Sequence, residues 1–161
     1  MRATCFRPCL IVLLALGGAC LARMPAPLIL YNHSPSVPIG FYVRVARPPR
    51  LGDFVTVRAR DVAAHYARQR HFDEPGDLFI KRVGAKAGAR VCANGDYVTV
   101  ASLRLMRHEH DNAGRVLPRW RGCRLLRRDE LFLVGDTPDS FDARYWGPVS
   151  VAHIEGVWRP I

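Results

Sequence analysis

Lysine is scarce in this sequence, although the chain is strongly basic. Only Lys81 and Lys86 are lysines, whereas the other 22 of the 24 basic residues are arginines. Against 14 acidic residues, this gives a formal net charge of +10. Such a charge attracts polyanions, including nucleic acids and anionic lipids. Because lysine is so rare here, a lysine embedded in an apolar run is a candidate for a chemical role.

Aromatic residues are nearly absent from the most basic part of the chain. Eight arginines lie between Arg104 and Arg128, against only Glu109 and Asp111, and Trp120 is the single aromatic residue there. A platform for single-stranded nucleic acid needs aromatic side chains interleaved with basic ones. We therefore favour a solvated or membrane-facing basic surface and expect no nucleic-acid partner. A nucleic-acid-binding domain is kept as a minor hypothesis.

Repeats and metal-binding patterns are also missing. No internal period of about 20–50 residues is visible, which argues against a repeat array. No Cys-x-x-Cys or cysteine/histidine spacing indicates zinc, and a turn explains His108-Glu109-His110 better than a metal site does. We expect no metal and no cofactor. A chain of 161 residues, 49% of them hydrophobic, suits one domain with a sizeable core.

The N-terminal region lacks an uninterrupted hydrophobic run of membrane-spanning length. Residues 9–22 carry no charge, but a spanning helix needs about 20 residues. Snorkelling by Arg23, together with the apolar stretch 27–31, could complete a membrane anchor. We expect residues 1–30 to form a cytoplasmic N-terminus and an uncleaved anchor helix, and residues 31–161 to form an exported domain. A cleaved signal peptide is the alternative.

Two of the five cysteines, Cys92 and Cys123, lie in the body of the chain. In an oxidising compartment, a disulfide between them would stabilise the fold by about 3–4 kcal/mol under the chain-entropy model. Two free thiols are equally consistent with the sequence, because sequence alone does not reveal how far apart the side chains lie.

The body of the chain has the pattern of many short strands separated by glycine and proline turns. Strands are predicted over residues 40–45, 53–58, 78–83, 96–102, 131–134, 148–152 and 154–158. Residues 60–70 predict the single helix, which Asp61 could cap. This pattern indicates a mainly β domain.

Three segments carry residues suited to catalysis. In the first, Ser34 and Ser36 are flanked by Pro35 and Pro38, directly after the apolar N-terminal segment. Proline restricts its own φ and the residue before it, and a nucleophile benefits from such rigidity. A proline/serine linker leading away from a membrane is the alternative explanation of the same residues.

The second segment contains Lys81. In a strand, Phe79, Lys81 and Val83 share a face. Apolar neighbours reduce the hydration of a lysine and lower its pKa, and a neutral lysine can take a proton from a serine. A lysine that extends from a sheet edge into solvent is the alternative.

The third segment is the polar loop 135–148, which follows a predicted core strand. It contains Ser140, Asp142 and Arg144. Such a loop can orient a catalytic group through hydrogen bonds. A surface loop with an ion pair between Asp142 and Arg144 is an equally good explanation.

The order of these segments resembles the type I signal peptidase superfamily. An apolar N-terminal segment is followed by Ser-x-Pro, by Lys-Arg-Val in a strand, and by Gly-Asp…Ser-x-Asp-x-Arg…Gly. Residues 36–42 and 140–149 are similar to the nucleophile and terminal motifs of the conjugative-transfer, TraF-like branch. The resemblance implies an antiparallel β-sheet body lying on the membrane. The expected fold is therefore a mainly β, signal-peptidase-like domain with one short helix behind an anchor helix.

The resemblance also implies a role for each matching residue. Ser36 would be the nucleophile and Lys81 the general base. The hydroxyl of Ser34 and the backbone N–H of Ser36 would form the oxyanion hole. The residues implied to orient the site are Ser140, Asp142 and Arg144.

Three departures from the family pattern affect loops rather than catalytic groups. Val37 replaces the usual methionine after the serine, and Ala143 replaces a frequent serine. Residues 85–89 keep only Gly88 of the usual Gly-x-Pro-Gly-Asp motif. We expect changed loop geometry and retained activity.

The implied function is that of a membrane-bound serine endopeptidase with a Ser/Lys dyad, acting on the periplasmic side of the bacterial cytoplasmic membrane. Its expected substrate is the precursor of an exported protein, specifically a conjugative pilin, from which it would remove the leader peptide. Some relatives in this branch also join the ends of the pilin into a circular product. The other partners would be the lipid bilayer and components of the conjugation or type IV secretion machinery. The alternative is an inactive, membrane-tethered assembly subunit of a pilus complex.

Overall fold

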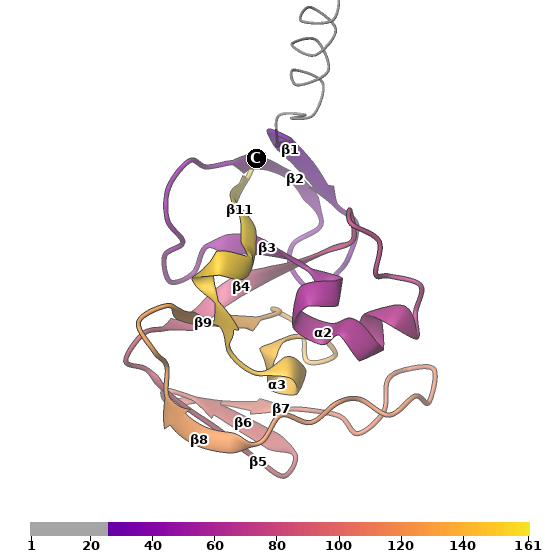
Figure 1. The fold of residues 1–161 in the computed structure, drawn as a ribbon, viewed down its shortest axis with the longest axis vertical. Helices are drawn as coiled ribbons and strands as arrows, with labels where there is room; N and C mark the ends of the chain where they lie inside the picture. Colours follow the sequence, from indigo (N-terminus) through magenta and orange to yellow (C-terminus); the bar gives the residue numbers. More distant parts are fainter. Residues whose placement is uncertain (1–25) are drawn as a thin grey trace, which may run out of the picture.

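A computed structural model describes residues 26–161, which form two antiparallel β-sheets with few helices (Figure 1). The strands are β1 (Ile29–Asn32), β2 (Gly40–Arg44), β3 (Phe54–Arg58), β4 (Leu78–Lys86), β5 (Arg90–Asn94), β6 (Tyr97–Val100), β7 (Leu103–Met106), β8 (Gly122–Leu125), β9 (Glu130–Val134), β10 (Val149–Ser150) and β11 (Ile154–Pro160). The helices are α2 (Ala59–Arg68), α3 (Ala143–Trp146) and the short 3₁₀ turn η1 (Val151–His153). Within the described residues, no helix is both long and apolar enough to cross a bilayer.

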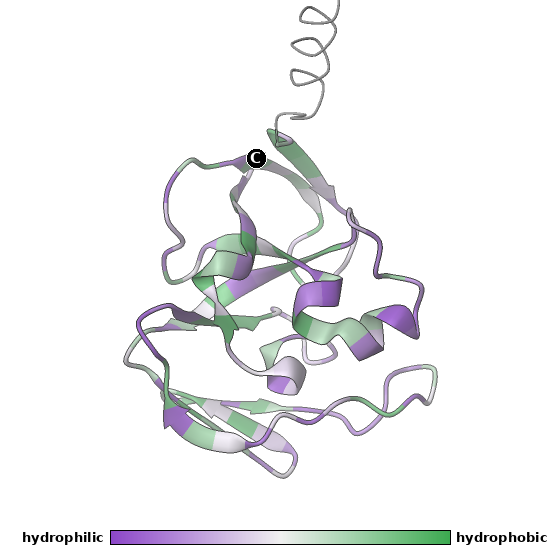
Figure 2. Ribbon diagram, in the orientation of Figure 1, coloured by the Kyte–Doolittle hydropathy of each residue, from purple (hydrophilic) through white to green (hydrophobic). Residues whose placement is uncertain are grey.

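The two sheets share one hydrophobic core. The large sheet has the strand order β1-β2-β11-β3-β4-β9-β10, and the small sheet has the order β7-β6-β5-β8. β3 and β9 are buried along nearly their whole length, as expected for central strands that are covered on both faces. Figure 2 shows hydrophobic residues concentrated in these central strands. Most of their buried side chains and those of β4, β5 and β6 belong to one cluster, in which Phe132 and Leu133 are fully buried. Phe54 of β3 and Ile80 of β4 belong to a second, smaller cluster.

The large sheet curls, so that strands distant in its order meet. Asp136 follows β9 and donates its backbone N–H to the carbonyl of Ser36 at 2.7 Å. Ser36 lies in the turn between β1 and β2, and three strands separate β2 from β9 in the sheet. Strand twist accumulates across a sheet of this width. The curl therefore brings the β1–β2 turn against β4 and β9.

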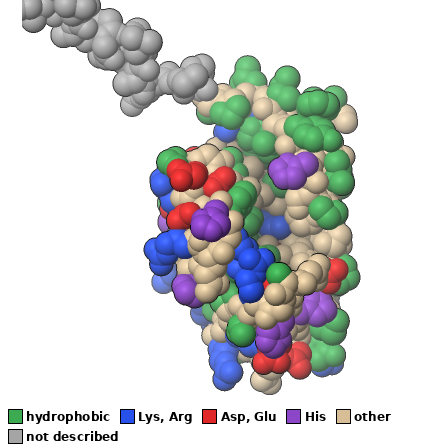
Figure 3. Space-filling view, turned by 90° about the vertical axis from the view of Figure 1, so that its right-hand side faces the viewer, with side chains coloured by type: hydrophobic (Ala, Val, Ile, Leu, Met, Phe, Trp, Pro, Cys, Tyr) green, Lys and Arg blue, Asp and Glu red, His purple; other side chains and the backbone are tan. Residues whose placement is uncertain are grey.

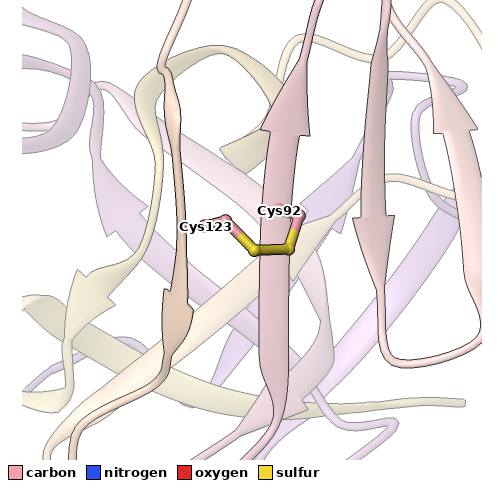
Figure 4. The surroundings of a disulfide bond; sticks show 2 residues. All are labelled: Cys92 and Cys123. Atoms are coloured by element: carbon pink, nitrogen blue, oxygen red, sulfur yellow. A yellow bond between two sulfur atoms is a disulfide. The ribbon is translucent and has the colours of Figure 1, made fainter.

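The small sheet alternates between buried and exposed residues. On β5, Val91 and Ala93 are buried, whereas Arg90 and Asn94 are exposed. Cys92 on β5 lies directly opposite Cys123 on β8, and the two form a disulfide (Figure 4). Sequence alone leaves this pairing open, and the register of the two strands decides it.

The helices differ in part from the prediction. α2 is confirmed, but Asp61 does not cap it, because the N-cap is Arg58 and Asp61 lies in the first turn. Helix α3 was not predicted from the sequence. This helix begins after Asp142, whose carboxylate accepts the backbone N–H of Arg144 at 3.0 Å. A carboxylate that accepts a first-turn N–H is a common way to start a helix.

The mainly β class is confirmed, whereas four strands were not predicted. These strands are β1, β5, β7 and β8. Residues 29 and 30 were predicted to belong to the anchor segment, but they lie in β1 and pair with β2. The expected anchor helix falls on residues outside those described.

Candidate active site

The curl of the large sheet places Ser36 against Lys81. Ser36 lies in the β1–β2 turn and Lys81 in β4. Lys81 Nζ donates a hydrogen bond to Ser36 Oγ at 2.9 Å, and both residues are buried. The structure thus brings together the two side chains that the sequence analysis assigned as nucleophile and base.

Burial controls the protonation of Lys81. Its side chain is 4% exposed, and its hydrogen-bond partners are two hydroxyl groups. Burial lowers the pKa of Lys81 to about 8, an effect that Arg144 reinforces and that Asp142 and Asp136 partly oppose. Among residues 26–161, no carboxylate forms an ion pair with Lys81. A lysine in this environment is neutral in a substantial fraction of molecules at mildly basic pH.

Ser34 lies beside Ser36 in the same turn. Its hydroxyl donates to Ser36 Oγ at 3.2 Å and accepts the Ser36 backbone N–H at 3.4 Å. The Ser34 hydroxyl and the Ser36 N–H therefore lie next to each other. Two such donors can together hold a negatively charged oxygen.

Ser140 contacts Lys81 from the loop that follows β9. Lys81 Nζ donates to Ser140 Oγ at 3.0 Å, and Ser140 is 3% exposed. Gly135 makes this approach possible. A Cβ on Gly135 would lie 2.0 Å from Ser140 Oγ and 2.8 Å from the carbonyl oxygen of Ser36. Only a glycine allows the end of β9 to pass so close to both serines.

Asp142 and Arg144 form a buried ion pair behind Ser140. Arg144 Nε donates to Asp142 Oδ1 at 2.9 Å, and both side chains are almost completely buried. Arg144 also donates to three carbonyl groups of residues 137–140 at 2.7–3.0 Å. Asp142 accepts the backbone N–H of Gly135 at 2.7 Å. The pair therefore fixes the loop that carries Ser140.

Asn32 is a site residue that the sequence analysis missed. It is buried, and its side-chain amide donates to the carbonyl groups of Ser34, Val37 and Pro38 at 2.8–3.2 Å. Its Oδ1 accepts the Ser34 N–H at 3.0 Å. Asn32 therefore sets the shape of the serine turn together with the prolines. The only signal in the sequence is its position just before this segment.

Arg82 and Asp136 support the same turn from outside. Arg82 makes two hydrogen bonds to the Asp136 carboxylate, at 2.8 and 2.6 Å. The backbone N–H of Asp136 in turn holds the Ser36 carbonyl. The residue that follows Lys81 in the sequence thus helps to position the serine.

A cleft of about 430 Å³ opens beside Ser36 and Lys81. One wall is formed by β1 and the turn after it, and the other by residues 76–81. Phe72, in the loop after α2, also lines the cleft. The face seen in Figure 3 is hollowed between two lobes of the surface.

The fold and this geometry together define a class of protein. A serine hydroxyl hydrogen-bonded to a buried lysine is the arrangement of Ser/Lys nucleophilic catalysis. Here the arrangement is built on a curled antiparallel sheet. The family model described as "Signal peptidase, peptidase S26" matches residues 3–161. The chain belongs to this signal peptidase family.

Individual relatives define the branch of the family. The plasmid transfer protein TraF of Escherichia coli is 32% identical over 165 aligned residues, which cover 90% of each chain. A probable conjugal transfer protein TraF of Sinorhizobium fredii is 34% identical over 145 residues, covering 81% of this chain and 74% of the relative. The crystal structure of a signal peptidase I from Enterococcus faecalis aligns with a TM-score of 0.40 and 20% identity, over 70% of this chain and 98% of that one. The TraF relatives confirm the predicted TraF-like branch.

Proposed function

We propose that this protein is a serine endopeptidase in which Ser36 is the nucleophile and Lys81 the general base. One observation carries the proposal: Lys81 Nζ lies 2.9 Å from Ser36 Oγ in a buried site, where the pKa of the lysine is lowered to about 8. A neutral lysine at this distance can take the serine proton.

The reaction begins when neutral Lys81 removes the proton of Ser36 Oγ. The oxygen attacks the carbonyl carbon of the cleaved peptide bond, and the carbonyl oxygen becomes negatively charged. The Ser36 N–H and the Ser34 hydroxyl stabilise this oxyanion, and one such donor contributes about 3–4 kcal/mol. To do so, the Ser34 hydroxyl turns away from Ser36 Oγ, to which it donates at 3.2 Å.

The protonated Lys81 then gives its proton to the leaving amine, and an ester remains on Ser36. A water molecule, or an amine of the substrate, attacks the carbonyl carbon of this ester and gives a proton to Lys81. The bond between this carbon and Ser36 Oγ then breaks, and Lys81 returns the proton to Ser36 Oγ, which frees the product and restores the site. Throughout these steps the Ser140 hydroxyl holds Lys81 Nζ in line with Ser36, as its 3.0 Å hydrogen bond indicates. Asp142 and Arg144 hold Ser140 in place.

The cleft suits an extended peptide. β1 is an edge strand among the described strands of the large sheet. β4 pairs with β9 only from Arg82 onward, so its residues 78–81 have one unpaired edge. A substrate strand can pair with exposed edges of this kind. Small side chains next to the cleaved bond are expected, because family pockets are shallow.

The substrate we propose is the precursor of an exported protein, and specifically a conjugative pilin from which the leader is removed. Support comes from the two relatives that are described as plasmid transfer and conjugal transfer proteins. Attack of the pilin's own amine on the ester would give a circular product. Components of the conjugation or type IV secretion machinery are the further partners that this role implies.

We further propose that the domain lies on the periplasmic side of the cytoplasmic membrane. Leu28, Ile29, Phe41 and Ile161 are exposed, and the last two are joined by a backbone hydrogen bond of 3.0 Å. Exposed apolar residues gathered at one end of a domain are suited to contact with a bilayer. The disulfide between strands β5 and β8 is typical of an oxidising compartment such as the periplasm.

Mass spectrometry of a conjugative pilin precursor tests the proposal. The precursor is incubated with the detergent-solubilised full chain, either wild type or Ser36→Ala. A loss of leader mass with the wild type alone supports the peptidase, and a further loss of one water molecule identifies a circular product. Identical masses with both proteins contradict it and favour the inactive assembly subunit.

A further inference from the structure

A second concave surface, here called the outer groove, runs between α2 and residues 115–120. It consists of two adjoining hollows of about 590 and 370 Å³, which meet at Pro118. A third hollow of about 480 Å³ adjoins at Leu117 and reaches Phe141. Neither the serine nor the lysine of the proposed dyad lines any of the three. The outer groove is therefore separate from the cleft.

One ion pair, in the third hollow, ties the end of α2 to the opposite side beside the outer groove. Arg70, just after α2, pairs with Asp111 on the opposite wall, and Arg115 Nε also donates to Asp111 at 3.0 Å. The Asp111 carboxylate further accepts the backbone N–H groups of Ala113 and Arg115 at 3.0 and 2.9 Å. The spacing of the walls is thus set before any ligand binds. A preformed groove loses less entropy when it binds than a flexible one does.

The outer groove is connected to the cleft by a row of aromatic rings. Tyr66 in α2 stacks on Phe141 with ring centroids 3.4 Å apart, and Phe141 packs edge-on against Phe79 at 5.9 Å. Phe79 in turn packs against Phe72 at 5.3 Å, and both line the cleft. Phe141 also follows Ser140 directly in the sequence. A chain that leaves the cleft along this row reaches the outer groove.

The lining of the outer groove suits an extended apolar peptide. Val116 is 69% exposed, although it lies in a concave surface. Leu117, Pro118 and Trp146 add further apolar surface to the two hollows. Apolar side chains left exposed in a concavity are typical of a binding site.

We propose that the outer groove binds an extended apolar segment of the precursor, outside the residues that fill the cleft. The identity of this ligand rests on the proposed function. A precursor held in the cleft presents its more distant residues to the groove at a high effective concentration, because the two sites are joined by the aromatic row. A lipid chain fits less well, since Arg115 and Arg119 line the outer groove and can donate to the carbonyl groups of a peptide but not to an acyl chain.

Binding of a fluorescently labelled pilin precursor to the full chain carrying Ser36→Ala tests the inference, since cleavage is not needed. Adding Val116→Glu should weaken binding about tenfold, because it places a carboxylate on an apolar contact surface. Leu51→Glu is the matched control. Leu51 is 67% exposed and follows an arginine, as Val116 does. The control should leave the Kd unchanged.

A short peptide that spans only the cleaved bond separates the groove from the cleft. Val116→Glu should raise the ratio of the precursor's Kd to the short peptide's Kd about tenfold. An unchanged ratio, an equal effect of Leu51→Glu, or a precursor that does not bind Ser36→Ala overturns the inference. Val116→Ser repeats the test without a new charge, and melting temperatures confirm folding. Failure of the proposed function is seen separately, as a wild-type chain that binds the precursor without cleaving it.

Discussion

Lys81 is held by hydroxyl groups rather than by a carboxylate, and this choice of partner determines its chemistry. A carboxylate at hydrogen-bond distance would stabilise the ammonium form and raise the pKa of the lysine. The hydroxyl groups of Ser36 and Ser140 stabilise it far less, so burial dominates and the pKa falls to about 8. Asp142, the nearby buried carboxylate, is paired with Arg144. A base is thus available near neutral pH.

The pH dependence of cleavage should report the ionisation of Lys81. Only neutral Lys81 can accept the serine proton, and its pKa is lowered to about 8. The value of kcat/KM should therefore rise about tenfold per pH unit below this pKa and reach a plateau above it. The measurement is the initial rate of cleavage of a peptide substrate between pH 5 and 10, at pH values where the enzyme is folded. A flat profile would exclude Lys81 as the base.

Replacing Lys81 by methionine should abolish cleavage and raise stability at pH 7. The pKa of Lys81 is about 8 in the folded state and about 10.4 in the unfolded state. The unfolded state therefore binds the proton more tightly, so the buried charge destabilises the fold below pH 8, and this cost disappears as the pH rises toward 10. Lys81→Met should gain about 1–3 kcal/mol at pH 7.

Thermal unfolding at pH 7 and at pH 10 measures this effect, and Lys86→Met is the control. Lys86 is exposed, so its replacement should change the melting temperature little at either pH. A Lys81→Met variant that melts below the wild type at pH 7 would contradict the argument from burial.

Two adjacent strands, β4 and β9, position much of the site, since β4 carries Lys81 and the loop after β9 carries Ser140. Successive side chains of a strand point to opposite faces, so Lys81 turns toward Ser36 while Arg82 reaches Asp136. Gly135 directly follows β9, and there the chain passes against both serines. The distance between the serine turn and the lysine therefore depends on the backbone at the end of β9.

Gly135→Ala should reduce kcat at least about 100-fold, since small displacements of reacting groups have effects of this size. The new Cβ would lie 2.4 Å from Ser140 Cβ and 2.8 Å from the Ser36 carbonyl oxygen, so one of the two serines must move. Gly88→Ala is the control, because it meets nothing within 4 Å and is strained only by its φ of +84°. It should lower the melting temperature and leave kcat unchanged. Equal kcat values for both variants would show that Gly135 does not determine the geometry of the active site.

The strands that sequence patterns predicted are those with consecutive β-branched or aromatic residues, such as β3. The edge strands β7 and β8, with sequences LRLM and GCRL, lack this signal and are ordered by pairing with β6 and β5. Apart from β6, the small sheet could therefore not be predicted from local preference. β1 was missed because its apolar residues 29–31 also extend the apolar N-terminal segment.

Side chains that act directly on a reacting group were easier to predict than those that position them. Ser36, Lys81 and Ser140 stand in motifs with recognisable neighbours in the sequence. Asn32 acts by satisfying three carbonyl groups of a turn, and Gly135 by having no Cβ. Neither role is visible until the backbone around the residue is known.

At the scale of the whole molecule, three kinds of link join the small sheet to the large one. The two sheets share a core. Glu130 on β9 pairs with Arg124 on β8, and these hydrogen bonds hold the pKa of Glu130 well below its usual range, at about 2. Arg107, after β7, is buried and donates to the carbonyl groups of Gly95 and Arg144. Arg107 thus connects the small sheet to the loop that carries Ser140, and this connection does not include the disulfide.

Removing the disulfide should therefore weaken the fold and spare the chemistry. The bond joins Cys92 and Cys123, which are 31 residues apart, and a crosslink over such a loop contributes about 2–4 kcal/mol to the free energy of unfolding. The double variant Cys92→Ser, Cys123→Ser should lose stability of this order, measured by denaturant unfolding, and the wild type in reductant should match it.

Cleavage by the double variant, measured at a temperature where it is folded, should stay within about twofold of the wild type, since rates respond to displacement of the reacting groups. Ser36, Lys81 and Ser140 lie on the large sheet and its loops, and Arg107 and Glu130 still attach the small sheet. A folded double variant with much lower kcat would mean that the disulfide transmits its effect to the site. In that case the links through Arg107 and Arg144 would not be sufficient to hold the Ser140 loop, and redox state would join pH as a determinant of activity.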